Sequence, residues 1–142
     1  MKKILLTTML LLTSVALSAS NTKKIPVAGI WQQVQLDPQS NKAIHLPVWK
    51  VLENDGTFHV FLIADAKCQC IITNQGLYEV KSDSTFSERI TGSITDANLV
   101  GRSNTITYHF DGPDKMNISY QIPGAASQTN ETWVRVKLEM PK

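Results

Sequence analysis

The stretch that decides the fold is residues 105–122, TITYHFDGPDKMNISYQI. Apolar and polar side chains alternate along both halves of this stretch, and the turn-forming residues 111–113 separate the halves. Successive side chains of an extended strand point to opposite faces, so the alternation predicts two strands, each with a dry face and a wetter face. The dry faces carry Ile106, Tyr108 and Phe110 in the first strand and Met116, Ile118, Tyr120 and Ile122 in the second.

The same pattern extends through the chain after residue 20. Short segments rich in strand-forming residues alternate with turn signals such as Asn54-Asp55-Gly56, where Asp-Gly favours a tight hairpin. The predicted strands are residues 27–36, 46–53, 57–64, 68–73, 77–81, 84–91, 105–111, 115–122 and 130–138. Apart from a short helical turn near residues 95–100, no segment shows a sustained helical periodicity of apolar residues.

These segments predict an all-β fold, a single antiparallel sheet of about eight to nine strands. Hairpins in series favour an up-and-down barrel, because closure hides the sheet edges that would otherwise pair with other chains. A sandwich is the alternative for such a chain. In residues 130–138 one face carries Thr132, Val134, Val136 and Leu138, and the other carries Glu131, Trp133, Arg135 and Lys137.

The N-terminus predicts export. Two lysines precede an apolar run over residues 4–17, and three small residues follow it. This order is typical of a secretory signal peptide, and the run is shorter than the roughly 20 apolar residues of a spanning helix. We therefore expect residues 1–20 to be a signal peptide and residues 21–142 to form the domain, in a periplasmic or secreted location. An uncleaved membrane anchor is the alternative.

The charge pattern argues against a nucleic-acid partner. The chain has 14 Lys and Arg residues against 12 Asp and Glu residues, and the signal peptide contains two of the lysines. The mature chain is therefore formally neutral, with both signs interspersed, whereas nucleic acid requires a clustered basic surface. About 120 residues remain after cleavage, which is enough for one domain to bury a core without disulfides.

Two motifs near the ends of the mature chain resemble motifs of the lipocalins. Gly29-Ile30-Trp31 resembles the Gly-x-Trp signature that opens the first lipocalin strand, and Trp133-Val134-Arg135 resembles the late strand of that barrel. The resemblance implies that Trp31 plugs the closed end and that Arg135 crosses its ring in a cation–π contact. Gly29, Trp31, Trp133 and Arg135 are thus expected to close the barrel, with a ligand platform as the alternative role.

A larger part of the chain resembles a family of exported bacterial lipocalin-like domains of unknown function. The resembling segments are residues 50–58, 76–80, 82–88 and 132–136, which occur in the order expected for the family. This resemblance implies a calycin-type barrel. It implies little about activity, because one fold can host many functions.

Glu88 is the residue most at odds with its predicted surroundings, since it shares a strand face with Phe86 and Ile90. A carboxylate on an apolar face either contacts a partner or is desolvated at a high cost in free energy. Glu88 therefore lies on the outer wall in water, or it points inward. An inward Glu88 would bind a polar group of a ligand or form an ion pair with Arg135 or Lys50.

The other reactive side chains show no catalytic or metal signature. Cys68 and Cys70 are two residues apart, at the limit of disulfide reach in a strand. Free thiols, a strained or intermolecular disulfide and a metal or redox role all stay open for them. His45, His59 and His109 lack a metal-ligand spacing, and no hydrolase, metalloprotease or nucleotide-binding motif is present. We expect no metal and no cofactor.

We expect a soluble, non-enzymatic binding protein that holds a small, partly apolar molecule in the barrel, with no membrane span in the mature chain. The candidate ligand-binding residues are Trp49, Phe61, Tyr78, Phe86, Glu88, Tyr108 and Tyr120. One alternative is a filled barrel that binds a protein or a glycan through its outer surface. Another is a small enzyme that uses Glu88 with a nearby His or Tyr. An apolar cavity favours the binding protein, a filled interior the interaction module, and a polar cavity with a perturbed carboxylate the enzyme.

Overall fold

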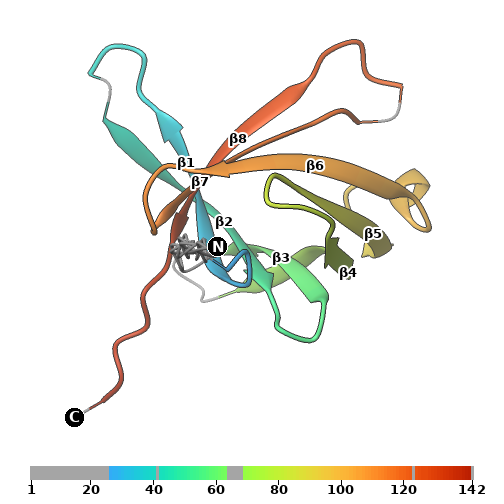
Figure 1. Ribbon diagram of the computed structural model, residues 1–142, viewed down its shortest axis with the longest axis horizontal. Helices are drawn as coiled ribbons and strands as arrows, with labels where there is room; N and C mark the ends of the chain where they lie inside the picture. Colours follow the sequence, from blue (N-terminus) through green and yellow to red (C-terminus); the bar gives the residue numbers. More distant parts are fainter. Residues whose placement is uncertain (1–25, 41, 64–68, 123, 142) are drawn as a thin grey trace, which may run out of the picture.

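The computed structural model describes residues 26–40, 42–63, 69–122 and 124–141 (Figure 1). Eight strands form one closed antiparallel barrel in which each strand pairs with the next. They are β1 (Gly29–Leu36), β2 (Ala43–Leu52), β3 (Thr57–Ile63), β4 (Cys70–Val80), β5 (Thr85–Ser93), β6 (Ser103–Phe110), β7 (Lys115–Tyr120) and β8 (Thr129–Arg135). The predicted all-β up-and-down barrel is confirmed.

Pairing between the first and the last strand closes the sheet. The β1–β8 register runs from Trp31 opposite Arg135 to Val34 opposite Thr132. Both strands are therefore hydrogen-bonded on both sides, and the described sheet has no free edge to protect. Figure 1 shows the β1–β2 and β7–β8 loops projecting from the body of the barrel, with the chain after β8 running away from it.

The strand that differs most from its prediction is β4, which runs straight through the turn expected at residues 74–76. Residues 70–73 and 77–80, which come from two predicted segments, therefore belong to one strand, and the nine predicted segments become eight strands. The short helical turn expected near residues 95–100 is confirmed as a 3-10 helix, η1 (Ala97–Leu99), between β5 and β6.

Residues 74–76 of β4, Asn-Gln-Gly, look like a turn in the sequence. In the structure they lie beside bulges and in close contact with the neighbouring strand. The register shifts against β3 between Val60 and Phe61, and against β5 between Gln75 and Gly76. Gly76 permits close approach of the neighbouring strand, because a Cβ atom there would lie 2.0 Å from the backbone oxygen of Arg89. A glycine inside a strand is typical of such a bulge or close approach.

The inward face of β8 is the one with the charged side chains. Trp133 is buried with 2% exposure, whereas Val134 and Val136 are only partly buried and lie on the other face. The apolar-looking row of valines and threonine therefore forms outer wall. A valine on the outside costs little, since much of a protein surface is apolar, so the hydrophobic pattern alone does not orient this strand.

Trp31 plugs one end of the barrel. Its side chain is fully buried, and its Nε1 donates a hydrogen bond to the carbonyl oxygen of Val27 at 2.9 Å. The guanidinium carbon of Arg135 lies 4.1 Å from the centroid of the Trp31 ring. Arg135 also donates hydrogen bonds to the carbonyl oxygens of Ala28 and Pro26 at 3.0 and 2.8 Å. The guanidinium thus ties the chain that leads into β1 to the end of β8.

Gly29 makes room for this arrangement. A Cβ atom at Gly29 would lie 2.3 Å from Nη1 of Arg135, and the residue has a φ of +147°, which favours glycine. Partial burial lowers the pKa of the Arg135 guanidinium, and the nearby Asp114 carboxylate opposes this shift. A guanidinium remains cationic at neutral pH in either case, so the cation–π contact with Trp31 is present.

An aromatic layer fills the barrel next to the plug. Neighbouring ring centroids are separated by 6.0 Å from Trp31 to Phe110, 5.6 Å from Phe110 to Tyr108, 5.5 Å from Tyr108 to Phe86 and 6.4 Å from Phe86 to Tyr78. Aromatic rings at these separations contribute packing energy beyond the area that they bury. The closed half of the barrel is therefore a packed core.

Replacing Trp31 with Ala should lower the free energy of unfolding by about 3–5 kcal/mol, as aromatic truncations in cores do. The matched control is Trp49→Ala. Trp49 is only partly buried on the outer wall, so its loss should cost clearly less. Chemical denaturation measures both values. Equal losses for the two variants would contradict the assignment of Trp31 as the plug.

Candidate functional site

A cavity of about 380 Å³ occupies the half of the barrel away from the Trp31 plug. Its lining comes mainly from the ends of odd-numbered strands and the starts of even-numbered ones, which meet at one end of an up-and-down barrel. Thr95, Leu99 and Arg102, from the loop that contains η1, complete the rim. The aliphatic wall includes Val48, Val60, Leu62, Ile90, Ile106 and Ile122.

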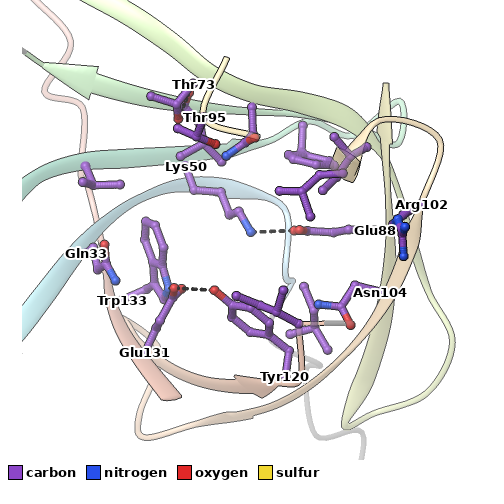
Figure 2. A pocket seen from close by; sticks show the side chains of 18 of the residues that line it. Gln33, Lys50, Thr73, Glu88, Thr95, Arg102, Asn104, Tyr120, Glu131 and Trp133 are labelled. Carbon is purple, nitrogen blue, oxygen red and sulfur yellow. Dashed lines mark hydrogen bonds and ion pairs between the residues drawn. The ribbon is translucent and has the colours of Figure 1, made fainter. Parts of the chain in front are cut away.

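An ion pair crosses the interior at the base of this cavity. Lys50 on β2 and Glu88 on β5 point toward each other in Figure 2, and the distance from Nζ of Lys50 to Oε1 of Glu88 is 2.6 Å. The two residues are only 6% and 8% exposed. Two charges removed from water to this extent require each other, because an isolated buried charge is very unfavourable. Glu88 is therefore an inward carboxylate paired with Lys50, and it lies neither on the outer wall nor beside Arg135.

Aromatic rings surround the ammonium group of Lys50. Its Nζ atom lies 5.4 Å from the centroid of the Phe58 ring and 5.8 Å from that of the Trp133 ring. Ring faces attract cations at such distances, and the attraction is larger where water is excluded. The aromatic contacts and Glu88 together hold the lysine side chain across the barrel.

A second carboxylate, that of Glu131 on β8, lines the same cavity. Its Oε1 accepts a hydrogen bond from the hydroxyl of Tyr120 at 2.8 Å, and its Oε2 accepts one from Nε1 of Trp133 at 2.9 Å. Both donors are neutral. The pKa of the Tyr120 phenol is raised, first by burial and then by the negative charge and hydrogen bond of Glu131, with a smaller contribution from Glu88. Tyr120 is therefore a protonated donor at neutral pH.

Asn74 contributes an unsatisfied acceptor. It lies at the first bulge of β4 and lines the cavity together with Thr73. Its Oδ1 atom is buried and has no hydrogen-bond partner within the described part of the chain. Buried polar atoms in folded proteins nearly always have a partner, which is often a water or a ligand when the protein itself supplies none. The cavity therefore presents a fixed acceptor to whatever occupies it.

Residues 26–142 match the model of a family described as a domain of unknown function (DUF4488). The chain belongs to this family. No curated protein matches the chain in a sequence comparison. What the protein does must therefore be argued from the site itself.

The cavity contains only two of the seven side chains that the sequence proposed for ligand binding, Glu88 and Tyr120. Trp49 and Phe61 are paired neighbours on the outer wall. They alternate with the inward residues of β2 and β3, so their side chains point away from the interior. The predicted aromatic lining is corrected here, since these two rings cannot reach a ligand inside the barrel.

The other three candidates belong to the packed layer at the closed end. Phe86 and Tyr108 are buried in the core, and Tyr78 packs against it. The hydroxyls of Tyr78 and Tyr108 donate to backbone carbonyl oxygens at 2.6 and 3.0 Å, so each ring is fixed by its polar tip. The alternation of the sequence predicts that these three side chains point inward. It does not predict how deep they lie in the barrel, because that depth depends on the Trp31 plug.

Sequence reasoning missed Glu131 and Asn74 as cavity residues. Glu131 had a usable signal, because it is two residues before Trp133 and shares its strand face, and the lipocalin resemblance already placed Trp133 inside. Asn74 had no such signal, because Asn-Gln-Gly is typical of a turn, and only the pairing of β4 with β3 shows that Asn74 lies in a strand beside a bulge. Of the four residues expected to close the barrel, Trp133 also lines the cavity.

The other reactive residues do not converge on the cavity. His45 is exposed and bonds Gln32, His109 is exposed and bonds Asn117, and His59 lies on the outer face of β3 beside Phe61. Cys70 is exposed, and Cys68 lies outside the described residues. Across those residues, no group of three potential metal ligands occurs and no helix has the length and hydropathy to span a membrane.

Replacing Glu88 with Gln should lower the free energy of unfolding by about 3 kcal/mol, because it leaves the charge of Lys50 buried without a partner. The double variant Lys50→Met/Glu88→Leu should recover most of this loss, since it removes both charges. Glu79→Gln is the control, because Glu79 pairs with Lys81 on the exposed surface and should change stability by less than about 0.5 kcal/mol. An unfolding free energy of Glu88→Gln equal to that of the control would contradict the buried pair.

The stabilisation that depends on the raised pKa of Tyr120 should weaken as the pH rises above about 10. The folded state raises the pKa of Tyr120 above the usual value of about 10, so the neutral phenol favours folding below that pH. As the pH rises above the unfolded value, the unfolded state releases this proton first and stability falls. The difference in unfolding free energy between the natural chain and Tyr120→Phe should therefore stay constant up to about pH 9 and shrink as the pH rises beyond about 10. A constant difference would contradict the raised pKa.

Proposed function

We propose that the protein is an exported, lipocalin-like binding protein whose barrel holds one small, partly apolar molecule. The observation that carries this proposal is the cavity of about 380 Å³ at the open end of the barrel. Ligand pockets commonly have volumes of about 300–1,000 Å³ and combine apolar walls with a few fixed polar groups. The aliphatic wall around Lys50, Glu88 and Glu131 has this composition.

The alternatives fit the geometry less well. An interaction module that works only through its outer surface needs no cavity, and the aromatic layer fills only the closed half of the barrel. An enzyme that uses Glu88 with a histidine or a tyrosine finds neither bonded to it among the described residues. Glu88 is bonded to Lys50, the hydroxyl of Tyr120 donates to Glu131, and the histidines lie on the outer wall. Binding of a ligand without a reaction is the function that best fits the apolar wall and the ion pair of this cavity.

Export and lipocalin kinship are parts of the same proposal and rest on different residues. Export rests on residues 1–20, where a basic start, an apolar run and small residues follow one another. Lipocalin kinship is supported by Gly29, Trp31 and Arg135, whose contact at the closed end has the form that the resemblance implies. A barrel that carries a poorly soluble molecule outside the cell is consistent with both.

Blocking the cavity should abolish binding without unfolding the barrel. Val60 lies directly opposite Lys50 in the β2–β3 pair, so Val60→Trp places an indole over the ion pair. The control Val51→Trp makes the same change on the outer face of β2. N-phenyl-1-naphthylamine, a neutral dye that brightens in apolar surroundings, should bind Val51→Trp like the natural chain. Its affinity for Val60→Trp should fall by about tenfold or more.

Native mass spectrometry of protein from its own host provides the independent measurement. The natural chain and Val51→Trp should carry an additional small mass, and Val60→Trp should not. Absence of any bound mass, together with no dye binding by the natural chain, would overturn the proposed function.

A further inference from the structure

We infer that the ligand carries a hydrogen-bond-donating cationic nitrogen, such as a primary ammonium group, on an apolar body. This inference rests on the proposed function and names the chemical class that the cavity accepts. It follows from the charges inside the barrel and from the hydrogen-bonding capacity that the described residues leave unused.

The interior of the cavity has more carboxylate charge than cationic charge. Glu88 and Glu131 both line it, and the only buried cation among the described lining residues is Lys50. Lys50 is matched to Glu88 at 2.6 Å. Glu131 accepts hydrogen bonds from the neutral groups of Tyr120 and Trp133 and forms no ion pair within the described ranges. One carboxylate in the wall therefore lacks a counter-charge.

Arg102 does not supply that counter-charge. It is the other cation in the lining, but it is exposed, and its Nε donates to the backbone oxygen of Asn98 at 2.8 Å. A solvated guanidinium at the rim is screened by water, whereas charges inside the barrel act through a medium of lower dielectric. The field felt by a bound group is therefore set mainly by Glu88, Glu131 and Lys50.

Around the ion pair and Glu131, the hydrogen-bonding capacity that the described residues leave unused consists mostly of acceptors. Glu88 is more than nine-tenths buried, and among the described residues only its Oε1 is bonded. Within the described ranges, the buried Oδ1 of Asn74 has no partner, and each oxygen of Glu131 accepts a single bond although it can accept two. The remaining N–H groups of Lys50 are its unused donors, and its Nζ lies near the ring of Phe58. A ligand with several donors satisfies this set best.

The aromatic groups and the local field favour the same class. The ring of Trp133 already lies near one ammonium group, at 5.8 Å from Nζ of Lys50, so the cavity accommodates a cation beside an aromatic ring. Burial is the main cause of the raised pKa of Tyr120, and the negative charges of Glu131 and Glu88 raise it further, as they would favour a cation at this position. A ligand carboxylate would instead compete with Glu88 for Lys50 and be repelled by Glu131.

Three ligands with the same apolar body test the class: octylammonium, octanol and octanoate, each used to displace N-phenyl-1-naphthylamine at neutral pH and low salt. Octylammonium should bind at least about tenfold more tightly than octanoate, with octanol between them. Glu131→Gln should reduce the affinity for octylammonium by about tenfold and leave octanol within about twofold. The control Glu79→Gln changes an exposed carboxylate and should alter none of the three affinities.

The outcomes separate this inference from the proposed function. Dye binding with equal displacement by all three ligands, with preference for octanoate, or with no displacement by octylammonium would overturn the cationic class and leave the binding function standing. No dye binding and no bound mass would overturn the binding function itself. If Glu131→Gln does not fold, the order of the three affinities on the natural chain still decides the inference.

Discussion

The contact of Arg135 with Trp31 is the interaction on which the rest of the structure depends. The two residues are opposite each other in the β1–β8 pair, so the contact that seals one end of the barrel also joins its first and last strands. An eight-stranded barrel is just wide enough to be filled by side chains or to hold one small ligand. Once Trp31 and its aromatic neighbours fill the closed half, the remaining space lies at the open end.

The polar side chains of the cavity, Lys50, Glu88 and Glu131, fit the proposed role of recognising a ligand. Replacing a buried ion pair by apolar side chains of similar volume is often neutral or stabilising, so stability alone does not account for Lys50 and Glu88 at this position. Glu131 is harder still to explain by stability, because the donors bonded to it in the described part of the chain are both neutral. A wall that must distinguish one ligand from another needs such groups, since apolar contacts discriminate weakly.

The two inward carboxylates differ in how far the sequence could predict them. Glu88 was singled out because it interrupts an apolar face between Phe86 and Ile90, and Lys50 was already one of its two expected partners. The choice between Lys50 and Arg135 required the barrel, because Arg135 is committed to Trp31 at the closed end and Lys50 reaches across from β2. Glu131 was obscured because the valines of β8 look like the buried face.

The sequence by itself determined the all-β class, most of the strands, their antiparallel order and the direction of most side chains, and it favoured a barrel over a sandwich. Alternation and turn chemistry act over a few residues, so they can be read locally. Only the tertiary structure decided how deep each inward residue lies, and that residues 74–76 continue β4 beside a bulge and do not form a turn. These depend on partners far away in the chain, such as β3 and β5 for β4. A local pattern shows that a side chain points inward, whereas the closed sheet decides whether it meets a packed core or a cavity.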